Sequence, residues 1–356
     1  MRRAIALAVL FGVAGLGISL WFLGESLLSV TRLPLWALAV GALLVGVNYL
    51  AGGLRLYLLT AMVGHPIGLG ASIRAYALGL FSAAITPGNA GQAPAVVLSF
   101  TGDGMPASRA WSVNLYVWVL DLVLLAYSLP VSLLVLGRST RLLTFASPWL
   151  LAAIAAAGAL TLLWLLLYQL PLLTRLTKGL FRLRWLRRWH DSVAAFLTRF
   201  ESATGELRSD TFAQRVALHL LTALVYFSTL FTFYVMVLSM RPGVPVLLTL
   251  AVAQVPMVLS TFFPTPGGAG LMEIFTASLM AAGTVSGDAG VAGSAVSSGL
   301  EGVDGETRGT IAAAVLGWRL LTFYSRFLVA PALGAARLGM KGLRSPGHDA
   351  PLDELQ

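Results

Sequence analysis

Residues 86–91 read Thr-Pro-Gly-Asn-Ala-Gly, and residues 265–270 read Thr-Pro-Gly-Gly-Ala-Gly. Each hexapeptide interrupts a long uncharged stretch, the first at 75–102 and the second at 242–272. Proline ends a helix and glycine permits a tight turn, so each stretch is predicted to break into two half-helices. The two copies lie about half of the 356-residue chain apart, which indicates two similar halves.

The composition is typical of a membrane protein. Hydrophobic residues make up 57% of the chain and charged residues 11%, with a mean hydropathy of +0.83, whereas an average soluble domain is about 25% charged. There is no cysteine, and the four histidines are far apart, so we expect no disulfide, metal site or resident cofactor. The net charge of +9 comes from basic residues beside apolar runs, which indicates contact with anionic lipid rather than nucleic acid.

Six uncharged or nearly uncharged runs are long enough to cross the hydrocarbon core, which takes about 20 residues. They are 4–24, 35–54, 110–136, 142–174, 216–240 and 309–336. The first run could also be a cleaved signal peptide, although the apolar core of such a peptide usually has about 7–15 residues. We therefore predict an all-α polytopic protein with six full transmembrane helices and two re-entrant or broken helices, at 75–102 and 246–282.

The basic segment 175–210 decides the predicted topology. It has six cations before its first acid, Asp191, and it is either a solvated loop or an interfacial helix on anionic lipid. Either form belongs in the cytoplasm. The segment is cytoplasmic when the first broken stretch enters from and returns to the cytoplasmic side and the second enters from and returns to the outside. Both termini are then cytoplasmic and the acidic loop 283–309 is outside, although Arg138 and Arg141 are also outside, against the charge rule.

This scheme predicts one transmembrane domain over residues 1–340, followed by a short cytoplasmic tail, 341–356. Its half-repeats are about 1–174 and 211–340, on either side of the cytoplasmic segment 175–210. Because the two broken stretches enter from opposite sides, the halves form an inverted two-fold repeat. Discontinuous helices that meet near the midplane of such a repeat are typical of transporters.

The two breaks supply the first group of candidate site residues. Backbone at membrane depth must be buried in protein or line a polar cavity, and the amides that begin a half-helix favour an anion such as phosphate. The alternative is a pair of kinks that only shape packing. The candidate substrate-binding residues here are Pro87, Gly88, Asn89, Gly91, Gln92, Pro266, Gly267, Gly268 and Gly270.

Asp121 and Glu273 are the only acids inside apolar runs. A charge there costs at least about 2.5–3.5 kcal/mol, so each needs a partner or a wet cavity. Glu273 follows Gly270 by three residues and is either a helix cap or a headgroup ligand or proton carrier. Arg319 is predicted to neutralise Glu273 or to bind a lipid phosphate.

Three further arginines complete the candidate site. Arg326 follows Arg319 by seven residues and is predicted to share its helix face. Arg55 and Arg74 lie near the cytoplasmic ends of their segments, where they either extend to the interface or contribute to the site. The buried amides Asn114 and Gln254 are predicted to be interhelical hydrogen-bond partners.

Three segments resemble the lysylphosphatidylglycerol synthase transmembrane family, or flippase-like domain, over about residues 5–340. They are Pro-Gly-x-Ala-Gly-Gln-Ala-Pro (87–94), Pro-Thr-Pro-Gly-Gly-Ala-Gly-Leu-Met-Glu (264–273) and Trp-Arg-Leu-Leu-Thr-Phe-Tyr (318–324). The resemblance implies site roles for Glu273, Arg319 and the glycines of both breaks, with Arg55 and Asp121 as weaker matches. The first break departs from the family pattern, which often has Arg, Glu and a later Arg. The residues at those places here are Asn89, Gln92 and Ala95.

The family's soluble aminoacyltransferase domain is not expected in this chain, and no nucleophile–base pair, Walker loop or metal cluster is found, so no catalytic residue is predicted. We expect a lipid flippase or transporter of the cytoplasmic membrane that moves a phospholipid or glycolipid headgroup. The alternative is a non-catalytic subunit that binds membrane lipid and presents it to a separate synthase or glycosyltransferase. The third hypothesis is an integral-membrane transferase.

Overall fold

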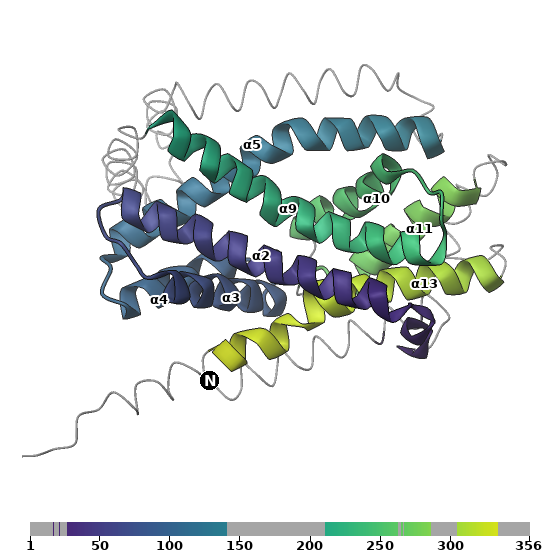
Figure 1. Cartoon of the computed structure of the whole chain (residues 1–356), viewed down its shortest axis with the longest axis horizontal. Coiled ribbons are helices and arrows are strands. Elements are labelled where there is room, and N and C mark those ends of the chain that lie inside the picture. The colour runs from purple at the N-terminus through teal and green to yellow at the C-terminus, as the bar shows by residue number, and fades with distance from the viewer. Residues whose placement is uncertain are drawn as a thin grey trace, which may run out of the picture.

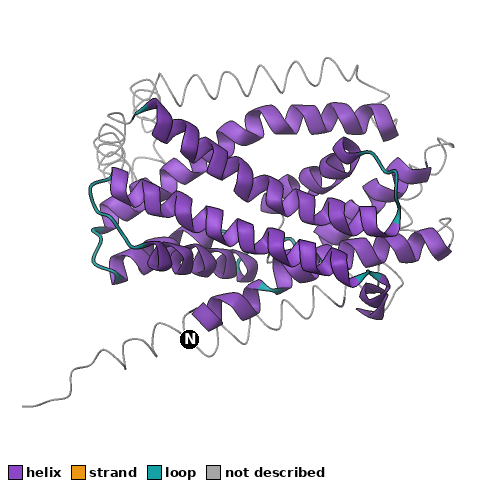
Figure 2. Ribbon diagram, viewed as in Figure 1, coloured by secondary structure: helices purple, strands orange, loops and turns teal. Residues whose placement is uncertain are grey.

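The computed structural model describes residues 27–140, 211–262, 267–285 and 305–333, together with residues 17, 21 and 265. Every regular element in this part of the chain is a helix, and short loops join the helices (Figure 2). Several predicted segments lie outside the described residues: the spans 4–24 and 142–174, the basic segment 175–210, most of the loop 283–309 and the tail 341–356.

The described helices fall into two groups in chain order. The first group is η1 (Leu27–Arg32), α2 (Leu35–Met62), α3 (Leu69–Ile85), α4 (Gln92–Gly102) and α5 (Ala107–Thr140). The second is α9 (Phe212–Met240), α10 (Val246–Leu259), η3 (Ser260–Phe262), α11 (Leu271–Val285), α13 (Gly305–Arg319) and η4 (Leu320–Tyr324). The helix that contains α13 and η4 continues to Leu333.

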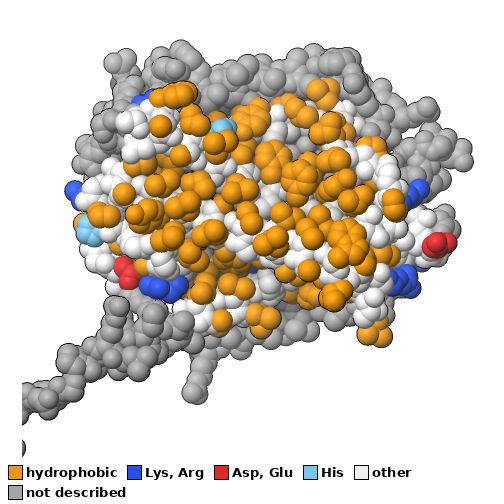
Figure 3. Space-filling view, in the orientation of Figure 1, with side chains coloured by type: hydrophobic (Ala, Val, Ile, Leu, Met, Phe, Trp, Pro, Cys, Tyr) orange, Lys and Arg blue, Asp and Glu red, His pale blue; other side chains and the backbone are white. Residues whose placement is uncertain are grey.

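Four helices are long and apolar enough to cross a membrane: α2, α5, α9 and the continuous helix Gly305–Leu333. They correspond to the predicted spans 35–54, 110–136, 216–240 and 309–336. Figure 3 shows an apolar belt across the middle of the molecule, with the charged side chains gathered toward its two ends. The chain is therefore a polytopic helical membrane protein, as the composition predicted.

The ends of the long helices follow from local sequence. At the end of α2, Gly64 adopts φ +68°, and the His65 N–H donates to the carbonyl of Thr60 at 3.0 Å. This is a Schellman ending, which satisfies carbonyls that the last turn leaves free. The start of α9 has a capping box in which Thr211 and Gln214 satisfy each other's backbone N–H groups.

Two hydrophobic cores organise the helices. One is built mainly from α2, α3, α4 and α5, with Phe100 and Leu59 among its fully buried side chains. The other is built mainly from α9, α10, α11 and α13, with Phe233 and Trp318 at its centre. Each core therefore contains one of the two broken stretches.

The broken stretches form two hairpins of helices too short to span, with 17 and 11 residues in α3 and α4, and 14 and 15 in α10 and α11. The first hairpin begins at residue 69, six residues before the predicted boundary. In the view of Figure 1, the α3–α4 hairpin opens toward the left end of the molecule and the α10–α11 hairpin toward the right. Their turns therefore meet inside the bundle.

Candidate functional site

The two hexapeptides have matching backbone conformations. Gly88 and Asn89 have φ values of +58° and +59°, and the aligned residues Gly267 and Gly268 have +58° and +67°. Asn89 is the only non-glycine residue with positive φ in the described part of the chain, and asparagine is among the residues that tolerate this region best. The half-helices α4 and α11 begin directly after these turns, as the sequence predicted.

The turns differ in how they satisfy one backbone N–H. In the first, the Gly91 N–H donates to Thr86 Oγ1 at 2.8 Å. In the second, the equivalent Gly270 N–H donates to Glu273 Oε2 at 2.8 Å, and the hydroxyl of Thr265 has no partner among the described residues. Only the second turn therefore places a carboxylate at the start of its half-helix.

The tips of the two hairpins pack against each other and against the last helix. A Cβ atom added at Gly88 would lie 2.9 Å from the carbonyl oxygen of Thr261, at the end of the opposite hairpin. A Cβ atom added at Gly267 would overlap the ring of Phe323. Phe323 also packs with Ala84 and Ala269, which come from the two hairpins. The glycines are thus required by close approach as well as by φ.

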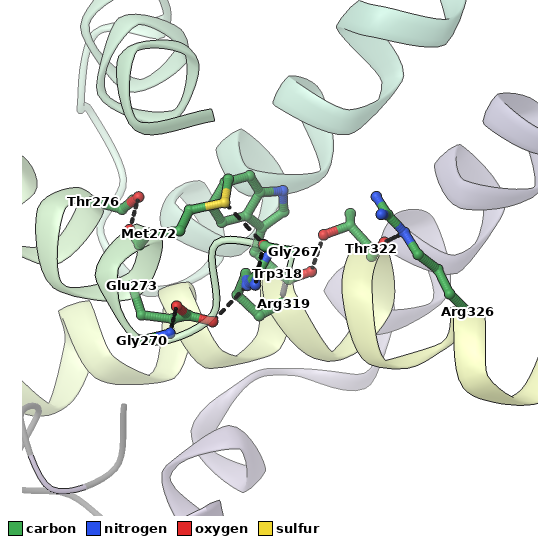
Figure 4. Close-up of polar contacts among 9 residues, drawn as sticks. All are labelled: Gly267, Gly270, Met272, Glu273, Thr276, Trp318, Arg319, Thr322 and Arg326. Carbon is green, nitrogen blue, oxygen red and sulfur yellow. Dashed lines mark hydrogen bonds and ion pairs between the residues drawn. The ribbon is translucent and has the colours of Figure 1, made fainter. Parts of the chain in front are cut away.

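Glu273 and Arg319 form a buried ion pair behind this contact (Figure 4). Arg319 Nε donates to Glu273 Oε1 at 2.6 Å, and the two residues are 3% and 0% exposed. The arginine also donates to the carbonyl of Gly267 at 3.3 Å, and its guanidinium carbon lies 4.1 Å from the centre of the Phe323 ring. Glu273 therefore caps α11 and neutralises Arg319 at the same time.

Arg55 does not extend to the interface, so that reading of the sequence was wrong. It is 2% exposed, and its NH1 donates to Asp121 Oδ1 at 2.6 Å and to Thr222 Oγ1 at 3.3 Å. The helix α2 continues to Met62, which places Arg55 well inside it, on the face toward α5 and α9. Asp121 supplies the partner charge, without which a buried guanidinium would be costly.

Arg326 lies farther along the same helix as Arg319, apart from the ion pair (Figure 4). Its Nε donates to the carbonyl of Thr322 at 2.8 Å, and its guanidinium carbon is 5.8 Å from the centre of the Phe323 ring. The residues between the two arginines, Leu320–Tyr324, form a π-helical turn. This wider turn changes the angle between the two side chains from that of an unbroken α-helix, yet both arginines line the same cavity and lie near the same Phe323 ring.

A cavity of about 660 Å³ joins these groups, within the range of small-molecule sites. Residues of both halves line it. The candidate residues on its wall are Arg55, Asn89, Gln92, Asp121, Gly267, Arg319 and Arg326. Its apolar wall includes Leu122, Leu125, Ala126, Leu129, Met257 and Val258, from α5 and α10. The cavity therefore has both polar and apolar walls.

Other predicted site residues lie off this wall. Arg74 is half-buried on α3, and Glu273 stands behind Arg319. Pro266 lies outside the described residues. The turn residues Pro87, Gly88, Gly91, Gly268 and Gly270 shape the tips without lining the cavity.

Sequence reasoning missed a polar group centred on Asn48 of α2. Its amide donates to the Val225 carbonyl at 2.6 Å and to hydroxyls of Ser228 and Thr229 at 3.2 Å, and its oxygen accepts from Tyr76. Asn48 is the one polar residue inside 35–54 besides Tyr49, which was the available signal. All these side chains line the cavity.

The other amides act as the sequence indicated only in part. Gln254 bridges α10 to α5, since its amide donates to Ser128 Oγ and its oxygen accepts from Ser132 Oγ, both at 2.8 Å. Asn114 instead donates to the carbonyl of Ala110 in its own helix. Within the described ranges no cluster of three His, Asp or Glu side chains could hold a metal ion.

The fold and the site define a helical membrane protein in which two broken hairpins meet beside a cavity with polar and apolar walls. Residues 4–301 match the family described as the lysylphosphatidylglycerol synthase TM region. The chain belongs to that family. It is also 27% identical to a UPF0104 membrane protein of Archaeoglobus fulgidus over 266 residues, which covers 70% of this chain and 78% of the relative. The matched family range ends before α13, so the likeness predicted at 318–324 lies beyond it.

Proposed function

We propose that this protein moves a lipid headgroup across the cytoplasmic membrane through the cavity between its two halves. The observation that carries the proposal is the make-up of the cavity wall. Arginines and amides form one part, and leucines of α5 with Met257 and Val258 form another. A lipid has the same two parts, so its headgroup fits the polar side and its chains fit the apolar side.

The arrangement of the hairpins supports transport rather than binding alone. The two hairpins open toward opposite ends of the molecule (Figure 1). Their tips approach each other closely at Gly88 and Thr261. Under the proposal they are the two members of an inverted repeat, with both termini in the cytoplasm. In such transporters, one repeat rocks against the other around a fixed central site.

The test is a leaflet-exchange assay on the full chain reconstituted in liposomes. Lipids with a fluorescent label on one acyl chain are placed in both leaflets, and an impermeant reductant bleaches the outer one. With the protein present, we expect bleaching to continue beyond the outer-leaflet fraction. Binding of lipid without exchange would contradict transport and favour a subunit that presents lipid to a separate synthase or transferase.

A further inference from the structure

The charges around the cavity do not balance. The charged side chains on its wall are Arg55, Arg319, Arg326 and Asp121. Asp121 pairs with Arg55, and Glu273, behind the wall, pairs with Arg319. No carboxylate in the described part of the chain contacts Arg326, whose Nε donates only to the carbonyl of Thr322 in its own helix. Among the described residues, one positive charge on the wall is therefore left without a counter-charge.

An unbalanced charge inside a membrane protein is costly, and where it persists it marks the path of a substrate or ion. An anion that enters the cavity would supply the missing counter-charge. The terminal nitrogens of Arg326 have no protein partner among the described residues, and a guanidinium can bind phosphate through two parallel hydrogen bonds. Arg319 contacts the same Phe323 ring at 4.1 Å, so it adds positive potential nearby.

A cationic headgroup has no comparable partner. Both oxygens of Glu273 are in use, one by Arg319 and one by the Gly270 N–H, and the residue is 0% exposed. The other carboxylate, Asp121, is held by Arg55 at 2.6 Å. An amine on the other oxygen of Asp121 would lie beside Arg55, which already neutralises that carboxylate, and would share the cavity with the unbalanced Arg326.

We propose that the cavity selects a lipid whose headgroup is an anionic phosphate without a neutralising amine, and that Arg326 binds this phosphate. The inference rests on the proposed function, because it names the substrate class of the same cavity. Asn89 and Gln92 line the cavity as neutral hydrogen-bond donors for the remaining headgroup oxygens.

The test measures lipid retention by native mass spectrometry on the full chain. The protein is offered equal amounts of phosphatidylglycerol, phosphatidylcholine and lysylphosphatidylglycerol with the same acyl chains. We expect phosphatidylglycerol to be retained about tenfold or more over the other two, since a hydrogen-bonded charge contributes about 1.5–3 kcal/mol. Inorganic phosphate in a competition arm should displace little of it, because phosphate lacks the chains that contact the apolar wall.

The variants Arg326→Gln and Arg326→Lys test the assignment of the residue. The first should lose about tenfold or more of its phosphatidylglycerol affinity, and the second should keep part of it. Arg74→Gln is the matched control, because Arg74 does not line the cavity. No carboxylate in the described residues loses a partner in Arg326→Gln, so its melting temperature in detergent should not fall.

Equal retention of the three lipids, or a preference for the cationic one, would overturn the inference. Unchanged lipid selectivity in Arg326→Gln would also overturn it. Full displacement of the lipid by inorganic phosphate would overturn it too, because the site would then be one for the free anion. Leaflet exchange that ignores the headgroup would overturn the inference and leave the proposed function standing. Selective binding with no exchange would support the inferred headgroup selectivity and contradict the proposed transport.

Discussion

At the scale of single residues, the two oxygens of Glu273 have different partners. One accepts from Arg319 and the other from the Gly270 N–H. A carboxylate is favoured at this position both by the positive end of α11 and by the arginine. Glutamine would keep an acceptor for Gly270 but would leave the charge of Arg319 buried alone.

Breaking this pair from either side should destabilise the protein. Glu273→Gln leaves a buried cation and Arg319→Gln leaves a buried anion, and each is expected to cost about 3–5 kcal/mol. The double change to glutamine should recover most of the lost stability, because no charge is then left alone. Thermal unfolding in detergent, followed by size-exclusion chromatography, measures all three variants.

Transport should stay impaired in the double variant, since the positive potential of Arg319 is gone. Strictly additive losses of stability would show that the two side chains do not interact in the membrane. The Arg55–Asp121 pair serves as a comparison. The Asp121 side chain is 42% exposed, so Arg55→Gln leaves a carboxylate that solvent can screen and should cost less than Arg319→Gln, which leaves the fully buried Glu273.

At the scale of elements, the turn before α11 depends on Gly267. Its φ is +58°, and an added Cβ would overlap the Phe323 ring. Gly267→Ala should therefore cost about 1–3 kcal/mol and reduce leaflet exchange. Gly46→Ala in α2 is the control, because nothing lies within 4 Å of its added Cβ and alanine favours a helix. Equal tolerance at both positions, measured by melting temperature, would show that the turn is an ordinary kink.

The sequence was sufficient to locate the breaks but not the partners of every polar residue. Proline and glycine act locally, so the starts of α4 and α11 could be predicted from the hexapeptides alone. The burial of Arg55 depended on its ion pair with Asp121, which lies 66 residues away in the sequence. Asn48 was missed for the same reason, since its partners Ser228 and Thr229 belong to the other half. Contacts between halves cannot be derived from the pattern of one helix.

At the scale of the whole molecule, the four long helices run in two opposite directions. In Figure 1, α2 and α13 run toward the end where the first hairpin opens, and α5 and α9 run away from it. The residues Arg109 and Arg215 lie near that end, at the starts of α5 and α9. This end is the cytoplasmic one in the proposed orientation.

Cysteine labelling can test this orientation directly, because the chain has no cysteine of its own. Ala107 is the first residue of α5, Pro242 follows α9, and both are exposed. The start of α5 and the end of α9 lie at opposite ends of the molecule (Figure 1). In intact cells, Ala107→Cys should be protected from an impermeant maleimide and Pro242→Cys should react. Labelling of both after the membrane is opened is the control for access. The reverse pattern would mean that the protein is inserted the other way round.

The π-helical turn at Leu320–Tyr324 also bears on how this helix can change over evolution. In an unbroken α-helix, two residues seven positions apart face within about 20° of each other. The wider turn takes up one additional residue, which shifts the direction of Arg326 relative to Arg319 by about 100° from that in an unbroken helix. A chain that lacked this extra residue would reach the same point in the cavity with an arginine one position earlier. Insertion or deletion, rather than substitution, is therefore the change to which the spacing of these two cations is most sensitive.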